Sequence, residues 1–177
     1  LIPIVLLLFF LLVAREIYQY VEPFNGEVED GFAIEKIDSG YGGPTCLEWA
    51  DNSSLLMCDR DSGRILLLDA DDGFKSVALL SGLDHPHDVH LTSDHLFVSE
   101  EGQLSRYNRS NLSFSDPVVL IEGIPSGNHQ TNAINSFPNG TLIWHSGSTC
   151  NVCEQSDERN AALLWVDPVT GEHGVLA

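Results

Sequence analysis

The sequence predicts an all-β fold, a β-propeller of four-stranded blades preceded by an N-terminal hydrophobic segment. Beyond residue 42, short apolar runs alternate with turn residues and no helical period is sustained, which is typical of β structure. The runs also recur at a spacing near 42 residues, which indicates a repeat architecture. A composition with 43% hydrophobic and 19% charged residues can bury a core and argues against wholesale disorder.

The first repeat shows the expected strands most clearly. Apolar runs predict strands over 54–59, 64–69 and 76–80. Asp61-Ser62-Gly63 and Asp71-Asp72-Gly73 separate them and predict turns. An additional entering strand is expected near 32–37.

Later segments repeat this pattern. Pro86 follows Pro44 by 42 residues, and Gly123-Ile124 follows Gly82-Leu83 by 41. The run 55–58 returns at 96–99 and at 142–145, and Asp69…Gly73 returns at Asp167…Gly171 once a 14-residue insertion at 147–160 is allowed for. A unit of ~40–45 residues with four short strands is one propeller blade. Residues 43–177 therefore hold about three blades, and since closed rings use ~4–8, we expect the chain to be the first part of a longer propeller.

The N-terminal region divides into two parts. Residues 1–14 read LIPIVLLLFFLLVA, a length typical of a signal-peptide core and shorter than the ~20 residues of a membrane span. A signal peptide and a membrane anchor both remain open. Residues 15–42 are acidic and rich in glycine, and we expect an acidic tether that ends in the entering strand.

Several features indicate an exported protein, either extracellular or membrane-anchored and facing outside. The hydrophobic start is one, and the even number of four cysteines fits an oxidising compartment. Four N-glycosylation acceptor sequences begin at Asn52, Asn108, Asn111 and Asn139. The net charge of −18 repels phosphate backbones, so nucleic-acid binding is excluded.

The cysteines form two pairs. Cys46 and Cys58 lie symmetrically about Asn52, as do Trp49 and Leu55, so a hairpin with its tip at Asn52 would place the two sulfur atoms opposite each other. A cross-strand disulfide is feasible there. Cys150-Asn151-Val152-Cys153 fits a redox dithiol, half of a zinc site or a small structural disulfide loop, and we favour the loop.

Two weaker patterns could suggest metals. His85, His87, His90 and His95 match no recurrent ligand spacing, so no metal site is predicted from them. The acidic turn Asp69-Ala70-Asp71-Asp72-Gly73 lacks the remaining ligands of a twelve-residue calcium loop, and a solvated turn is the better interpretation.

The third repeat carries the most specific motif. It reads GNHQTNAINSFPNGTLIW over 127–144 and GSTCNVCE over 147–154, followed by Arg159, two alanines and a strand that ends in Asp167-Pro168. This pattern, with GLDHPHDV at 82–89 and LFVSE at 96–100, resembles the sorbosone and soluble glucose dehydrogenase family over about residues 44–177. The resemblance implies a six-bladed propeller that uses pyrroloquinoline quinone (PQQ) with Ca²⁺.

The same resemblance implies site residues. His129 matches the general base that takes a proton from the sugar hydroxyl as hydride passes to the quinone, a task that suits an imidazole. Gln130 is a weaker candidate for substrate contact. The resemblance implies an aldose, sugar alcohol or sugar aldehyde as substrate, leaves the electron acceptor open, and places the main PQQ and Ca²⁺ ligands beyond residue 177, so that residues 1–177 alone would be inactive.

One difference from the family pattern leaves other functions open. Family members commonly carry Arg a few residues after the histidine, where this chain has Asn132 and Ala133. A non-catalytic, glycosylated binding propeller is therefore the main alternative. A calcium-dependent propeller lactonase or esterase is a second one, although no set of carboxylates that would converge on the axis is evident.

Overall fold

The computed structural model describes residues 28–177. The chain divides into two units, Leu1–Gly40, described from residue 28 on, and Tyr41–Ala177. The expected signal or anchor segment at 1–14 lies outside the described residues. Over the described part of the first unit the backbone forms no strand, so the entering strand expected near 32–37 is wrong. Its apolar side chains Phe32, Ile34 and Ile37 are exposed, and a strand pattern without a neighbouring strand gains no ladder hydrogen bonds. No helix within residues 28–177 is long and apolar enough to cross a bilayer.

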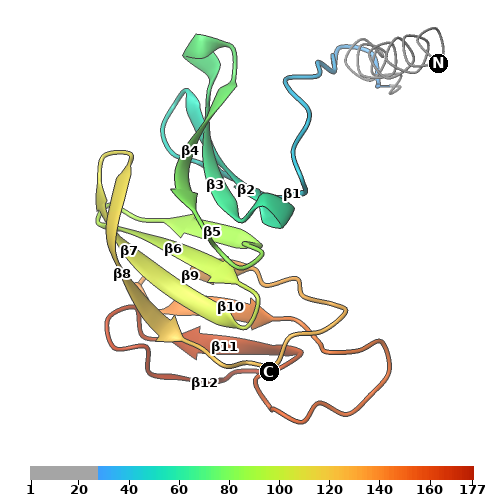
Figure 1. Cartoon of the computed structure of the whole chain (residues 1–177), viewed down its shortest axis with the longest axis vertical. Helices are drawn as coiled ribbons and strands as arrows, with labels where there is room; N and C mark the ends of the chain where they lie inside the picture. The colour runs from blue at the N-terminus through green and yellow to red at the C-terminus, as the bar shows by residue number, and fades with distance from the viewer. Residues whose placement is uncertain (1–27) are drawn as a thin grey trace, which may run out of the picture. The chain divides into compact units, whose positions relative to one another are not determined.

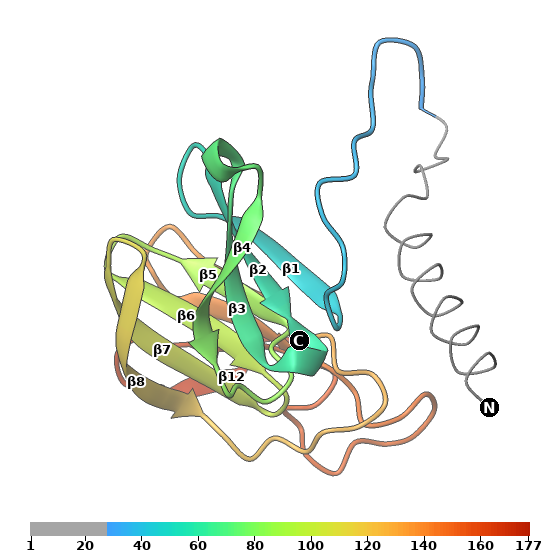
Figure 2. The same ribbon diagram turned by 45° about the horizontal axis from the view of Figure 1, so that its top comes forward.

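The second unit contains three antiparallel four-stranded sheets, whose strands follow one another in chain order (Figures 1 and 2). The first sheet comprises β1 (Pro44–Trp49), β2 (Ser54–Asp59), β3 (Arg64–Asp69) and β4 (Lys75–Ser81). The second comprises β5 (Asp88–Leu91), β6 (His95–Glu100), β7 (Gln103–Ser110) and β8 (Ser113–Ile121). The third comprises β9 (Ile134–Ser136), β10 (Leu142–Ser146), β11 (Ala162–Val166) and β12 (His173–Val175). These are three successive propeller blades, which confirms the predicted fold.

Because neighbouring strands are antiparallel, each sheet has two distinct ends. One end, called the turn end below, carries the hairpins that join first to second and third to fourth strands, at 50–53, 70–74, 92–94, 111–112, 137–141 and 167–172. The opposite end, called the loop end, carries the second-to-third connections at 60–63, 101–102 and 147–161 and the links between sheets at 82–87 and 122–133. In Figure 1 the long connections of the loop end extend to the right.

The first hairpin has the register that the cysteine spacing predicts. Cys46 pairs with Cys58 and Trp49 with Leu55 across β1 and β2. The two sulfur atoms form a disulfide, with a Cα–Cα distance of 5.1 Å. The symmetry of the sequence about Asn52 therefore predicted both the turn and the covalent bond.

Two of the three buried apolar clusters lie between neighbouring sheets, whereas the third, formed by Met57, Leu66 and Leu68, belongs to the first sheet alone. Side chains that alternate along β6 point to opposite faces: Leu96 and Val98 pack against the first sheet, whereas Phe97 packs against the third. The cluster around Phe97 includes Trp144, which is fully buried and donates from Nε1 to Ser99 Oγ over 2.7 Å. Each sheet therefore depends on its neighbour for burial, as expected of blades.

The predicted repeat is visible in a backbone contact at the loop end. Leu83 N donates to Gly63 O in the first sheet (3.1 Å), and Ile124 N donates to Gly102 O in the second (3.2 Å). Both glycines have positive φ, and a Cβ at either position would lie within 2.4 Å of the carbonyl oxygen of Leu83 or Ile124. Glycine is therefore required in the turn between the second and third strands of these two sheets, because the segment that follows the fourth strand passes directly against that turn.

In the third sheet the corresponding position, directly before β11, is Ala161, with a left-handed φ of 54°. Ala161→Gly is expected to raise the free energy of unfolding by about 0.5–1 kcal/mol, because it removes left-handed strain that exceeds the added entropy of the unfolded chain. Urea unfolding measures this change. The control Ala162→Gly, in the adjacent strand, should lower stability by about 1 kcal/mol. Equal losses for both variants would contradict the assignment of strain to Ala161.

Candidate functional site

The two halves of the third-repeat motif meet at the loop end. His129 and Ser148 form an antiparallel bridge, with His129 N donating to Ser148 O (3.2 Å) and Ser148 N donating to His129 O (3.1 Å). The segments touch backbone to backbone: a Cβ on Gly147 would lie 2.0 Å from His129 O, and one on Gly127 would lie 2.2 Å from Thr149 O. Glycine at both positions therefore allows the insertion to seat against the histidine segment.

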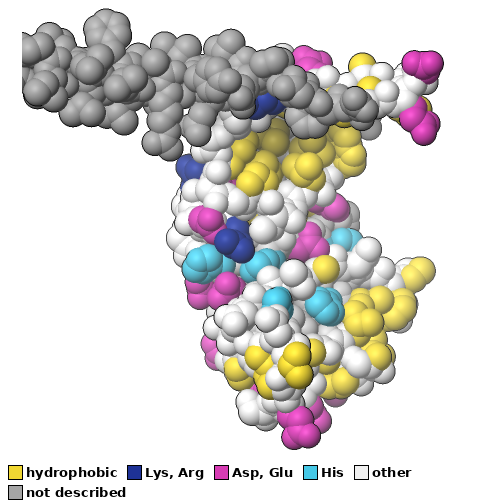
Figure 3. Space-filling view, turned by 90° about the vertical axis from the view of Figure 1, so that its right-hand side faces the viewer, with side chains coloured by type: hydrophobic (Ala, Val, Ile, Leu, Met, Phe, Trp, Pro, Cys, Tyr) yellow, Lys and Arg dark blue, Asp and Glu magenta, His cyan; other side chains and the backbone are white. Residues whose placement is uncertain are grey.

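The imidazole of His129 is exposed and contacts the insertion. Its Nε2 lies against the side-chain oxygen Oδ1 of Asn151, which stands between Cys150 and Cys153. An amide oxygen only accepts hydrogen bonds, so Nε2 carries the proton and Nδ1 keeps the basic lone pair. Figure 3 looks onto the loop end and shows histidine side chains gathered near its middle.

The insertion is held by local bonds. Cys150 and Cys153 form a disulfide, which confirms the predicted structural loop. Gln155 Oε1 accepts from Thr149 N (3.1 Å) and from Thr149 Oγ1 (2.9 Å). Further along, Arg159 binds Asp157 through Nε and NH2, with a closest approach of 2.6 Å. The loop that carries Asn151 is thus braced on both sides.

The ion pair makes the insertion sensitive to acid. Hydrogen bonds from Arg159 lower the pKa of Asp157 to about 2. Because this value lies below that of the unfolded chain, the pair stabilises the fold above about pH 4, and its contribution is lost as the pH falls toward 2. NMR titration of the carboxyl carbon should show this low midpoint, and Arg159→Gln should return it toward 3.8. Midpoints near 4 in both proteins would exclude the ion pair.

Gln130, the predicted substrate contact, is mostly buried. Its Oε1 accepts from Asn132 Nδ2 (3.3 Å), whereas its buried Nε2 has no hydrogen-bond partner within the described part of the chain. Asn132, at the departure from the family pattern, is 1% exposed; it donates to Glu100 O (2.9 Å) and accepts from Gly147 N (2.8 Å). Asn132 therefore ties the second sheet to the insertion and does not face a ligand.

The side-chain amide of Asn160 is also buried, which the sequence did not indicate. Asn160 donates from Nδ2 to Pro125 O (2.9 Å) and to Gly147 O (3.1 Å), and so joins the end of the insertion to the incoming link. Its position after a charged stretch carries no periodic signal, because its role depends on two segments remote in sequence.

The histidines of the second link are arranged differently from His129. His85 Nδ1 contacts Asp84 Oδ1 at 2.9 Å on the surface. His87 is buried, burial lowers its pKa, and its Nε2 has no hydrogen-bond partner among residues 28–177. No group of three or more His, Cys, Asp or Glu within residues 28–177 is placed to hold a metal ion.

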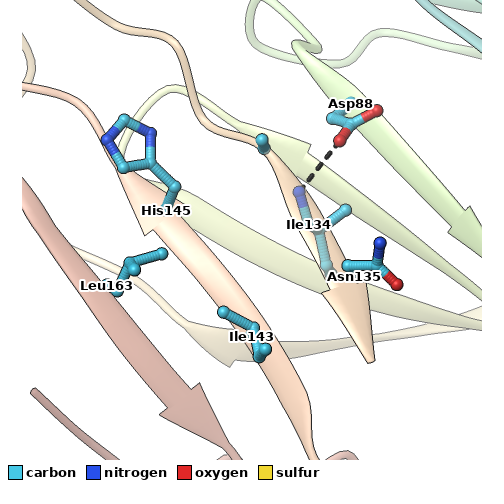
Figure 4. Close-up of a pocket in the computed structure, with 7 residues that line it drawn as sticks. Asp88, Ile134, Asn135, Ile143, His145 and Leu163 are labelled. Atoms are coloured by element: carbon cyan, nitrogen blue, oxygen red, sulfur yellow. Dashed lines mark hydrogen bonds between the residues drawn. The ribbon is translucent and has the colours of Figure 1, made fainter. Parts of the chain in front are cut away.

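A separate pocket of 340 Å³ opens beside β9 and the third sheet (Figure 4). Its lining joins polar and apolar side chains: Asp88, Ala133, Ile134, Asn135, Ile143, His145 and Leu163. Asp88 accepts from Ile134 N over 2.8 Å, and burial raises its pKa. His145 Nδ1 contacts Thr131 O instead of the carboxylate. Neither His129 nor Gln130 lines this pocket.

Residues 41–177 do not by themselves fit PQQ or Ca²⁺. PQQ is a tricarboxylate, and all six cationic side chains of residues 41–177 already bind within the protein: Arg60, Arg64, Lys75 and Arg159 pair with aspartates, whereas Arg106 and Arg109 donate to carbonyl oxygens. In the acidic turn, the Asp69 carboxylate accepts a hydrogen bond from Asp71 N, which is the arrangement expected of a solvated turn.

Comparison with known proteins adds evidence at the level of the fold. No protein-family model matches the chain, and no curated protein matches its sequence. The PQQ-bound aldose sugar dehydrogenase of Streptomyces coelicolor superposes with a TM-score of 0.57 and 19% identity over 76% of this chain and 47% of that one. A protein of Thermus thermophilus, provisionally described as an oxidoreductase (glucose dehydrogenase), gives a TM-score of 0.54 and 20% identity over 65% of this chain and 40% of that one. The chain thus spans less than half the length of these structures, and the predicted fold of β-propeller blades is confirmed.

Proposed function

We propose that these three blades belong to a sugar-oxidising propeller of the quinoprotein dehydrogenase type, in which His129 accepts the proton of a sugar hydroxyl. The observation that carries this proposal is the exposed imidazole at the loop end, seated against the disulfide-closed insertion on a fold shared with a PQQ-bound sugar dehydrogenase. An imidazole with a free Nδ1 lone pair can accept a proton near neutral pH.

The charges of residues 41–177 indicate which parts of the proposed site these blades could supply. The six cations of residues 41–177 are engaged, so the groups that bind the cofactor's carboxylates must come from blades outside these three. When bound, PQQ would supply the oxidant. Residues 41–177 would supply the proton acceptor, the loop that orients it and one side of the path by which the substrate reaches it.

The test uses the complete propeller that contains these three sheets. After reconstitution with PQQ and Ca²⁺, it should bind the cofactor, seen by its absorbance, and reduce an artificial dye when an aldose is added. Cofactor binding with no turnover on any aldose, sugar alcohol or sugar aldehyde would overturn the proposal.

Absence of both PQQ binding and dye reduction, with sugar binding detected by calorimetry, would instead establish a binding propeller. The buried, fully engaged Asn132 and the engagement of every cation in residues 41–177 favour that second candidate. Lactone hydrolysis that is lost on chelation would point to the calcium-dependent hydrolase.

A further inference from the structure

All four N-glycosylation acceptor sequences of the chain lie at the turn end of the sheets. Asn52 is in the β1–β2 turn, Asn111 in the β7–β8 turn and Asn139 in the β9–β10 turn. Asn108 lies near the end of β7, opposite His95, the first residue of β6. His129 and the insertion lie at the opposite, loop end. The acceptors and the candidate site are therefore segregated by the topology of the blades.

The acceptor side chains differ in how freely they can be reached. All four are exposed, and three stand in turns without strand pairing of their own. Asn111 has a left-handed φ of 56°, and Asn139 stands within the turn that Gly140 N closes on Phe137 O (2.9 Å). Asn108, in contrast, is paired on both sides, and its Nδ2 donates to Asp116 Oδ2 (3.3 Å).

We propose that N-linked glycans on Asn52, Asn111 and Asn139 cover the turn end and leave the loop end free for ligand access. In the transfer, the Asn Nδ2–C1 bond forms, the C1–O bond of a lipid-pyrophosphate-linked oligosaccharide breaks, Nδ2 loses one proton and the lipid pyrophosphate leaves. A glycan is bulky and strongly hydrated. It is therefore compatible with an exposed surface such as the turn end and would obstruct a site that must admit a ligand. This inference does not depend on the proposed function, because it holds equally for a binding propeller.

The first experiment maps the glycans. The full chain, directed by a cleavable signal sequence into the secretory pathway of a eukaryotic host, is collected from the medium and treated with peptide-N-glycosidase in ¹⁸O-water. Mass spectrometry should find the label at Asn52, Asn111 and Asn139. Asn→Gln at each of these should remove one glycan, whereas Asn108→Gln should change nothing. Secreted protein with the three turn positions unmodified would overturn the proposal.

The second experiment tests the free end. Glu154→Asn creates a new acceptor sequence with Gln155 and Ser156 on the exposed insertion. A glycan there should slow the reaction of His129 with diethyl pyrocarbonate, followed by peptide mass spectrometry. Removal of the native glycans should leave that rate unchanged. A rate that rises when the native glycans are removed would show that they screen the loop end and would contradict the segregation.

Discussion

His129→Ala is expected to lower kcat/KM for sugar oxidation by about 10²- to 10⁴-fold in the complete propeller, the contribution typical of a general base. The reason is the position of the imidazole: it is exposed at the loop end, and its backbone is tied to Ser148 while its ring contacts Asn151. Removal of the ring would remove the proposed proton acceptor. The measurement is steady-state dye reduction by the PQQ- and Ca²⁺-loaded protein.

The control for His129 is a histidine remote from the loop end. His95 begins β6 at the turn end and packs its ring against Phe97 at a centroid distance of 5.9 Å. His95→Ala should leave kcat/KM unchanged, and both variants should retain the far-UV circular dichroism of the parent. Activity of His129→Ala within a few-fold of the parent would exclude His129 as the base.

A substitution at Asn151 tests the same proposal with a smaller expected loss of activity. Asn151→Ala removes the oxygen that holds Nε2–H and leaves the imidazole itself, so we expect a smaller loss than for His129→Ala. A KM effect without a kcat effect would indicate that Asn151 contacts substrate and does not orient the ring.

The parts of the fold that could be predicted from sequence are those governed by local spacing. The symmetry of Cys46 and Cys58 about Asn52 defines one hairpin register, and the structure has that register. The recurrence of Asp69…Gly73 at Asp167…Gly171 marks the third-to-fourth-strand turn of two blades, and both aspartates accept backbone N–H groups there. Such features depend on residues a few positions apart, which sequence displays directly.

Long-range packing limits the rest. The apolar residues within 32–37 suggest a strand, but no partner strand lies beside them in the described part of the first unit. The burial of Asn132 depends on Glu100 O and Gly147 N, which are 32 and 15 residues away. Neither contact has a periodic signature, so the sequence shows a departure from the family pattern at Asn132 but does not show that its side chain joins the second sheet to the insertion.

Trp144→Ala is expected to be the most destabilising single substitution in the core, with a loss of about 4 kcal/mol in the free energy of unfolding. Trp144 is the largest fully buried side chain of the described residues and packs between the second and third sheets. Its loss leaves a cavity between blades that can close only if β6 and β10 move toward each other, and it leaves the buried Ser99 Oγ without the hydrogen bond from Nε1. Urea unfolding followed by far-UV circular dichroism measures the effect without relying on tryptophan fluorescence.

Two matched variants separate the packing of Trp144 from its hydrogen bond. Trp144→Phe keeps a six-membered ring and loses the five-membered ring with its Nε1–H donor, so an intermediate loss of about 2 kcal/mol is expected. Trp165 lies on the neighbouring strand of the same hairpin, paired with Ile143, and is only partly buried, so Trp165→Ala should cost less than about 1 kcal/mol. Equal losses for Trp144→Ala and Trp165→Ala would show that the second and third sheets are not joined through Trp144. Because the second and third sheets share the buried cluster around Trp144, such a result would remove the physical basis for treating these two sheets as neighbouring blades of one propeller segment.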